Sequence, residues 1–174
     1  MKMQIIPTVL AALIGLAACT KPAPVIDTIG EQNKLVVQNY TDAVVKGDTS
    51  AIEGFLAGTY MAYGPALNDS TDRQQDIAEW KKNWREAWSS VDFDRAGTIA
   101  FTVPADGRFP GDWVSDWAKI TVNYKNGSPS VTFWWNAVYL IKDGKIQIVR
   151  VFYDLNDILV QQGFKVTPPE PAAK

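Results

Sequence analysis

The sequence contains no histidine. This absence excludes Ser-His-Asp and Cys-His nucleophilic sites, in which an imidazole takes the proton of the nucleophile, and it excludes the zinc sites that use histidine ligands. Acid–base chemistry in this chain must therefore use Asp, Glu, Tyr, Lys or water. Aromatic side chains are plentiful, with seven Trp, six Tyr and seven Phe, and such side chains build apolar clefts as well as cores.

Basic charge and cysteine are also scarce. Lys and Arg number 17 against 19 Asp and Glu, which gives a formal net charge of −2, so nothing in the composition indicates nucleic acid as a partner. Cys19 is the only cysteine, which excludes a disulfide within the chain. Asp69, Asp72 and Asp76 lie close together in sequence but lack the spacing of an EF-hand calcium loop. We therefore predict neither a metal site nor a bound cofactor.

The first 18 residues have the pattern of an export signal. A short positive region precedes the almost wholly apolar stretch 4–18, which is too short for a comfortable bilayer span of about 20 residues. The stretch ends in Leu16-Ala17-Ala18-Cys19, and small residues before a cleavage point suit the narrow pocket of a signal peptidase. This ending resembles the lipobox of bacterial lipoproteins, in which the cysteine receives a diacylglycerol and becomes the new N-terminus.

The lipobox resemblance implies a stable membrane anchor on Cys19, because several acyl chains on one residue hold a protein firmly. Thr20 follows the cysteine, where an Asp would resemble the inner-membrane retention signal of diderm bacteria. We therefore expect a lipid-anchored protein of the cell envelope, in the outer membrane if the organism has one, exposed to the periplasm or the cell surface. The alternatives are an ordinary secreted protein that is cut near the same place and an uncleaved anchor.

The chain divides into four predicted parts: a signal peptide over 1–18, a proline-containing lipidated tether over 19–29, one domain over 30–165 and a flexible Pro- and Ala-rich tail over 166–174. No second apolar run approaches transmembrane length. The domain is long enough to bury a sizeable core on its own.

Helical spacing of apolar residues predicts three helices in the first half of the domain. They cover residues 31–46, about 48–56, and a third segment that begins at one of several N-cap candidates in 69–72 and ends at about 89, with a short strand at 58–63 before it. In the third helix, Trp80, Trp84 and Trp88 form a stripe, which we interpret as core in preference to a ligand cage.

From residue 92 onward the pattern changes to strands, predicted over 96–103, 113–124, 130–141 and 145–153. Asn126-Gly127 and Asp143-Gly144 are strong hairpin signals because both dipeptides tolerate positive φ. A last helix is expected from Asp154 or Asn156 to Gln162. Helices followed by an antiparallel meander indicate an α+β fold.

This order of elements resembles the nuclear transport factor two-like superfamily, and within it the SnoaL-like branch of polyketide cyclases. The segment Tyr153–Gly163 adds a local signature of an Asp, an apolar helix and Gln-Leu-Gly, although Gln162 replaces the Leu. The resemblance implies a cone-shaped curved antiparallel sheet packed on N-terminal helices, an α+β roll like that of cystatin, with an internal pocket. It also implies Asp154 as the general acid/base. The fold hosts isomerases, dehydratases and cyclases as well as plain binding modules, so it does not fix the function.

The hairpin turns allow an estimate of strand register. If Lys142 pairs with Lys145 and Lys125 with Ser130, the alternation of side chains places most apolar residues of these strands on one face of the sheet. We assign this face to the cavity, although a one-residue slip would reverse the assignment. The predicted cavity face includes the aromatic residues Phe133, Trp135, Tyr139 and Phe152 and the charged residues Asp116, Arg150 and Asp154.

From this face we predict a site. Asp154, Asp116 and Arg150 are its candidate catalytic residues, because buried carboxylates have raised pKa values and can carry protons near neutral pH. The candidate ligand contacts are Trp135, Tyr139, Phe133, Phe152 and Trp84. Two structural alternatives stay open: Asp154 caps the last helix, and Asp116 forms an ion pair with Arg150.

Two functions are compatible with these observations. One is a non-catalytic pocket domain that binds an apolar small molecule or a partner protein. The other is a cofactor-free isomerase, cyclase or dehydratase that uses Asp154 for proton transfer. The missing histidine and the export signal favour the first. A homodimer through the outer face of the sheet would suit Trp117 and Trp134.

Overall fold

The computed structural model describes residues 27–165 and residue 167. The predicted signal peptide 1–18, Cys19 and most of the predicted tail lie outside the described residues, so their expected roles stay predictions. Among the helices that are described, none is long and apolar enough to cross a membrane.

The helices begin at the acidic caps that the sequence offers. Asp27 caps α1 (Thr28–Lys46), and Gly47 ends that helix in the left-handed conformation with φ 68°. Asp48 caps α2 (Thr49–Phe55). Asp72 and Gln75 form a capping box at the start of α3 (Arg73–Lys82).

The third helix is shorter than the prediction. It continues only as a π-helical turn at Asn83–Ala87, and the chain is already in a strand at Trp88. This change of structure places Trp80 and Trp88 in different elements, yet their rings still meet edge to face with centroids 5.7 Å apart.

Six strands form one sheet with the order β2-β1-β6-β5-β4-β3. Only the β1–β6 pair is parallel. The short strand β2 was not anticipated from the sequence. The bounds are β1 Leu56–Tyr63, β2 Ser70–Asp72, β3 Trp88–Val103, β4 Gly111–Tyr124, β5 Val131–Lys142 and β6 Lys145–Phe152.

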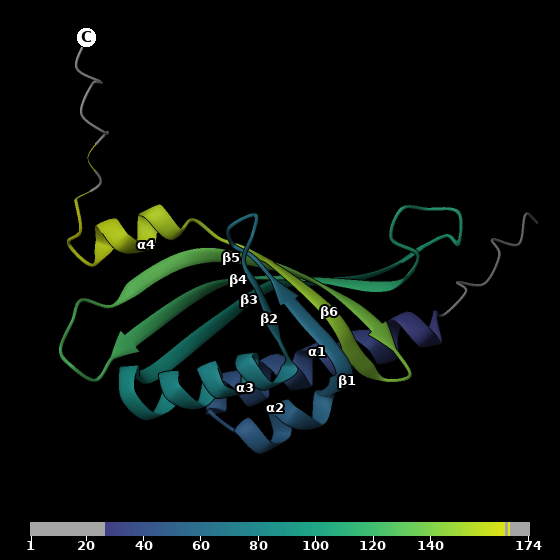
Figure 1. The fold of residues 1–174 in the computed structure, drawn as a ribbon, viewed down its shortest axis with the longest axis horizontal. Coiled ribbons are helices and arrows are strands. Elements are labelled where there is room, and N and C mark those ends of the chain that lie inside the picture. Colours follow the sequence, from purple (N-terminus) through teal and green to yellow (C-terminus); the bar gives the residue numbers. More distant parts are fainter. Residues whose placement is uncertain (1–26, 166, 168–174) are drawn as a thin grey trace, which may run out of the picture.

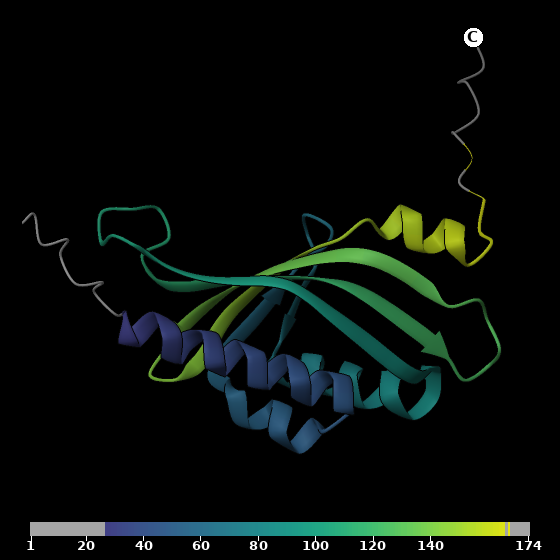
Figure 2. The same cartoon turned by 180° about the vertical axis from the view of Figure 1, so that it is seen from behind.

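The sheet is strongly curved, with α1, α2 and α3 on one side of it, while α4 (Leu155–Gln161) lies apart from them beyond the end of β6 (Figures 1 and 2). Two clusters of buried apolar side chains lie between the helices and the sheet, one around Val37, Ile52 and Tyr139 and one around Val122 and Val131. The predicted α+β fold with a curved sheet packed on N-terminal helices is confirmed.

The predicted pairing of β4 with β5 is wrong by two residues. Val122 pairs with Val131, and Ile120 pairs with Phe133, whereas the sequence analysis paired Val122 with Phe133. Because side chains alternate with a period of two, a shift of two residues leaves every side chain on its expected face. Phe133, Trp135 and Tyr139 therefore face the helices as predicted.

The pairing of β5 with β6 is wrong by one residue, which matters more. Lys142 pairs with Lys145 as expected, but a bulge shifts the register, so Tyr139 pairs with Val149 and not with Ile148. The shift turns Arg150 and Phe152 to the outer face. Phe152 is 54% exposed, and the Arg150 guanidinium lies 4.4 Å from the centre of the Tyr63 ring.

Candidate ligand cavity

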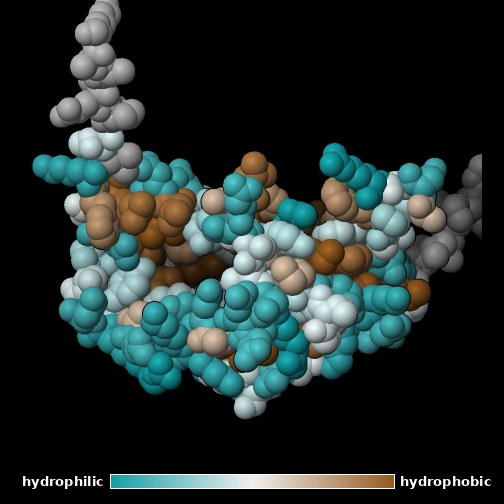
Figure 3. Space-filling model, viewed as in Figure 1, coloured by the Kyte–Doolittle hydropathy of each residue, from teal (hydrophilic) through white to brown (hydrophobic). Residues whose placement is uncertain are grey.

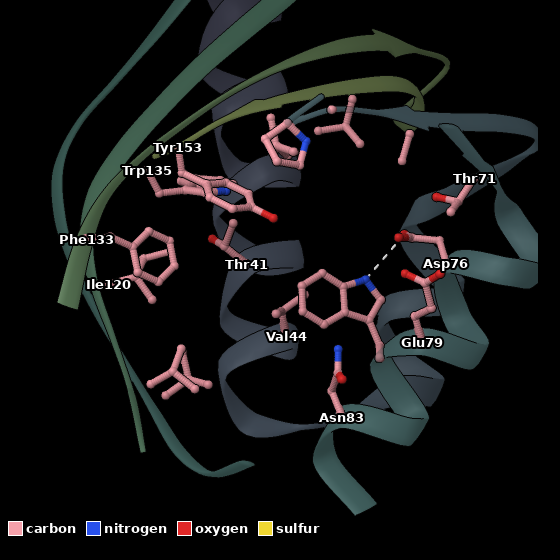
Figure 4. A pocket seen from close by; sticks show the side chains of 18 of the residues that line it. Thr41, Val44, Thr71, Asp76, Glu79, Asn83, Ile120, Phe133, Trp135 and Tyr153 are labelled. Carbon is pink, nitrogen blue, oxygen red and sulfur yellow. Dashed lines mark hydrogen bonds between the residues drawn. The ribbon is translucent and has the colours of Figure 1, made fainter. Parts of the chain in front are cut away.

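A cavity of about 610 Å³ lies between the curved sheet and the helices. Figure 3 shows a hollow with a hydrophobic interior that opens below α4. Strands β4, β5 and β6 form one wall, α3 and β2 form the facing wall, and α1 contributes Thr41 and Val44 (Figure 4). The register explains the β6 contribution, because the bulge turns Val149, Val151 and Tyr153 into the cavity.

The sheet side of the cavity is aromatic. Trp135 lies between two other rings, with centroids 5.5 Å from Phe93 and 6.4 Å from Tyr139. Phe133 and Tyr153 are neighbours on the same wall, with centroids 5.5 Å apart. The structure thus brings together three of the five predicted ligand contacts, Phe133, Trp135 and Tyr139, on one surface.

The helix side of the cavity carries a buried carboxylate, Asp76, which the site prediction missed. Its Oδ2 accepts a hydrogen bond from the Tyr60 hydroxyl at 2.9 Å and a second from the Trp80 indole nitrogen at 3.3 Å; a dashed line in Figure 4 marks the second. Burial raises the pKa of Asp76 to about 6, although both hydrogen bonds oppose the rise and the nearby charge of Glu79 adds to it. A group with this pKa changes its charge near neutral pH.

The hydroxyl of Tyr60 beside Asp76 remains a hydrogen-bond donor over the whole physiological pH range. Burial, the charge of Asp76 and the neighbouring Tyr40 raise the pKa of the Tyr60 hydroxyl far above its ordinary value. Tyr60 therefore stays protonated and donates to the carboxylate at any physiological pH. Burial likewise raises the pKa of Tyr40 and Tyr139.

The sequence did contain a signal for Asp76. It lies one helical turn before Trp80 and next to Ile77, on the apolar side of its helix. A carboxylate on a core-facing stripe is unusual unless it has hydrogen-bond partners or a function. From the sequence, Asp76 was a candidate only as a calcium ligand, and its spacing from Asp69 and Asp72 excludes an EF-hand loop. Within residues 27–165 and at 167, no group of three or more metal-ligating acids or cysteines gathers.

Trp84, the fourth predicted ligand contact, packs elsewhere. Its indole nitrogen donates a 2.8 Å hydrogen bond to the backbone oxygen of Val44, and its ring lies against Gly47, where a Cβ would come within 2.9 Å of the ring. Trp84 thus joins the end of α1 to the π-helical turn. It is not among the described residues that line the cavity, whereas Trp80 and Trp88 are.

Asp116 is fully buried on the inner face, but its partner is not the predicted Arg150. The Arg95 Nε lies 3.1 Å from Asp116 Oδ1, and the Thr98 hydroxyl donates to the same oxygen at 2.7 Å. Arg95 also donates to the Thr41 hydroxyl. Burial raises the pKa of Asp116, and the bonds from Thr98 and Arg95 oppose that rise. The expected ion pair of Asp116 with Arg150 is wrong, because the bulge in β6 removes Arg150 from this face.

Asp154 lies outside the cavity wall. It is exposed and caps α4, where its Oδ1 accepts a 3.0 Å hydrogen bond from the Asp157 backbone nitrogen. The structural alternative for Asp154 is therefore confirmed, and its expected place in a water-poor wall is wrong. The reason is again the register, together with the end of β6 at Phe152.

Comparison with known proteins adds the fold family. No protein-family model matches the sequence, and no curated protein matches it. Solved structures do match. One, a protein from Jannaschia sp. CCS1 that is named for SnoaL-like polyketide cyclases, is 17% identical with a TM-score of 0.64. The match covers 84% of this chain and 100% of that chain. An NTF2-like protein of unknown function from Burkholderia pseudomallei K96243 is 14% identical with a TM-score of 0.60, covering 75% and 97%.

The fold is NTF2-like. A third match, an LEH-like epoxide hydrolase from M. tuberculosis, is 15% identical with a TM-score of 0.61 and covers 77% of this chain and 91% of that chain. The resemblance to the nuclear transport factor two-like superfamily is thus confirmed at the level of fold. The three proteins share one fold but are named for different activities or for none. The likeness in fold therefore assigns no activity to this chain.

Proposed function

We propose that the cavity binds an apolar small molecule that carries one polar group, and that this group meets Asp76. The observation that supports the proposal is the combination of an open hollow of about 610 Å³ with a single buried carboxylate on its wall. Sites for small molecules commonly measure about 300–1,000 Å³ and combine apolar walls with a few polar groups.

The arrangement of the walls supports binding over a purely structural role. The rings of Phe93, Trp135 and Tyr139 support one another on the sheet wall and leave the hollow open. An apolar surface of this size that stays unfilled forfeits dispersion contacts, and a ligand restores them. A buried carboxylate also costs stability unless it is well partnered, so its retention beside the hollow fits a group that contacts a ligand.

Binding of a neutral fluorescent probe tests the proposal. N-phenyl-1-naphthylamine, which brightens in apolar sites, should bind the purified protein with one-to-one stoichiometry. Val44→Trp places a large ring in the cavity and should abolish the signal, whereas Leu35→Trp on an exposed part of the same helix should not. Equal probe binding by wild type and Val44→Trp would rule out the cavity as the site.

A second candidate function is proton transfer by Asp76, and its pKa of about 6 favours this alternative. A carboxylate with that pKa can take a proton from an acidic C–H and return it near neutral pH. The candidate is a cofactor-free isomerase, cyclase or dehydratase in which Asp76 takes the role first assigned to Asp154. Exchange of the acidic protons of 2-tetralone with D₂O, followed by NMR, is the test: Asp76→Asn should abolish acceleration and Asp154→Asn should leave it intact.

We further propose that the domain acts while tethered to a membrane through Cys19. The support is the sequence alone, namely the apolar stretch 4–18 and the small residues that precede the cysteine. Tethering would hold the cavity in the cell envelope, where apolar compounds concentrate near lipid.

A further inference from the structure

The charged residues on the cavity wall all have one sign. Asp69, Asp76 and Glu79 contribute to the wall, and no Lys or Arg is found among the described residues that line it. Asp76 and Glu79 project from α3 toward the same part of the hollow (Figure 4). Their mutual repulsion is part of the reason that the pKa of Asp76 is raised. This part of the wall therefore has a negative potential.

The basic side chains near the cavity are engaged elsewhere. Arg95 forms its ion pair with Asp116 at 3.1 Å, and Arg73 forms one with Glu53 at 3.2 Å. Arg150 lies on the other face of the sheet, over Tyr63. Among the described residues, no Lys or Arg lies within ion-pair distance of the three wall carboxylates.

Opposite the carboxylates lie aromatic rings. Trp135 and Tyr153 come from the sheet and face Asp76 and Glu79 across the hollow (Figure 4), and Trp80 is bonded to Asp76 itself. The faces of aromatic rings attract cations, most strongly where water is excluded. A positively charged group in this hollow would thus meet carboxylates on one side and ring faces on the other.

We infer that the natural ligand of the cavity is an organic cation, an apolar molecule that carries an ammonium group, and that Asp76 and Glu79 bind this group. The inference rests on the proposed function and narrows its ligand class. An ammonium group has donors for both carboxylates, and the amide of Asn83 and the hydroxyl of Thr71 lie on the same wall as further acceptors. An anionic ligand would have no basic partner there and would be repelled.

Three matched probes test the charge preference. 1-Naphthylmethylamine is a cation, 1-naphthalenemethanol is neutral and 1-naphthoate is an anion, and all share the ring of N-phenyl-1-naphthylamine, which they should displace. At pH 8, where Asp76 is ionised, the amine should bind about 5- to 30-fold more tightly than the alcohol, since an ion pair with cation–π contacts contributes about 1–2 kcal/mol. The naphthoate should bind most weakly.

Two variants locate the preference. Glu79→Gln should reduce the advantage of the amine over the alcohol several-fold. Glu31→Gln, a change of the same chemistry in the first turn of α1 outside the cavity lining, should leave both affinities unchanged. N,N,N-trimethyl-1-naphthylmethylammonium, which has a permanent charge but no N–H donor, should keep the part of the preference that comes from charge and ring faces.

The outcomes separate the two proposals. If the alcohol binds as tightly as the amine, or the naphthoate binds most tightly, the cation inference is overturned while the cavity remains a ligand site. If the fluorescent probe binds but none of the three compounds displaces it, the inference is also overturned. If the fluorescent probe itself fails to bind, the proposed function fails first.

Discussion

The hydroxyl of Tyr60 donates a 2.9 Å hydrogen bond to the carboxylate of Asp76, and this bond joins β1 to α3 beside the cavity. Asp76 is only 9% exposed and Tyr60 only 2%. The pair holds a titratable group at a fixed place on the wall of the hollow. Its position between β1 and α3 gives the site a defined geometry.

Removal of the Tyr60 hydroxyl should raise the pKa of Asp76 above its present value of about 6, because the bond favours the charged form. Tyr60→Phe is the variant, and the ¹³C shift of the Asp76 carboxyl carbon during titration is the measurement. The same change should lower the free energy of unfolding by about 1–3 kcal/mol, since a buried carboxylate loses a donor. An unchanged pKa would show that the bond is absent in solution.

The contribution of Asp76 to the free energy of unfolding should decrease as the pH rises from about 4 to 6. Folding raises the pKa of Asp76 from 3.8 to about 6. The stabilising contribution is therefore complete at a pH below 3.8, the pKa in the unfolded chain. It is lost as the pH rises through about 6, the pKa in the folded protein. The loss is about 3 kcal/mol. Tyr60, Trp80 and Glu79 are the groups that set this pKa.

Asp76→Asn isolates that contribution from those of the other carboxylates. The free energy of unfolding is measured by urea denaturation at pH 4 and pH 7. Relative to wild type, Asp76→Asn should be more stable at pH 7 than at pH 4, because the amide does not ionise. Glu79→Gln, at an exposed position one turn further along α3, should show a much smaller change. A difference that does not vary with pH would contradict the assigned environment of Asp76.

Shortening a side chain on the inward face of β5 should lower the free energy of unfolding more than shortening one on the outer face. Trp135→Ala should lower the free energy of unfolding by about 3–5 kcal/mol, as the loss of a large aromatic side chain from a packed site does. Trp134→Ala, at a neighbouring residue that is 65% exposed, should cost little. Comparable losses from the two variants would contradict the observed register.

The outer face of the sheet is where the predicted homodimer would form. Of the two tryptophans predicted for it, Trp134 is 65% exposed, whereas Trp117 is half-buried against Gly97. Sedimentation of the wild-type protein should show a concentration-dependent dimer that Trp134→Lys disrupts while the cavity still binds its probe. A monomer at all concentrations would end the homodimer prediction.

Lipid attachment at Cys19 should be visible by metabolic labelling with a palmitate analogue. Wild-type protein should carry the label and partition into detergent, and Cys19→Ser should do neither. Cells in which both forms incorporate the same label would contradict the lipobox interpretation.

Local signals predicted the fold well. The turn at Asp143-Gly144 depends on neighbouring residues, and the structure has it where the sequence predicts it, whereas the starts of the second and third helices were predicted only to within a few residues. The face of β4 and β5 was predicted even though their register was not, because the error was an even number of residues.

The site was harder to predict because it depends on register and on contacts between distant segments. A bulge in β6 carries no distinct sequence signal, and it moved Arg150 and Phe152 out of the predicted site. Asp76 is held at the cavity wall by a hydrogen bond from Tyr60, which is 16 residues away in the sequence and on another element. A pattern confined to one helix could show that Asp76 faces the core, but it could not show the cavity beside it.

The most direct test of the central claim is a crystal structure of the protein with 1-naphthylmethylamine. We expect density for the naphthyl ring inside the cavity against Trp135, with the amine within hydrogen-bond distance of Asp76. A probe found only on the outer surface of the sheet, with the cavity closed by its own side chains, would contradict the claim.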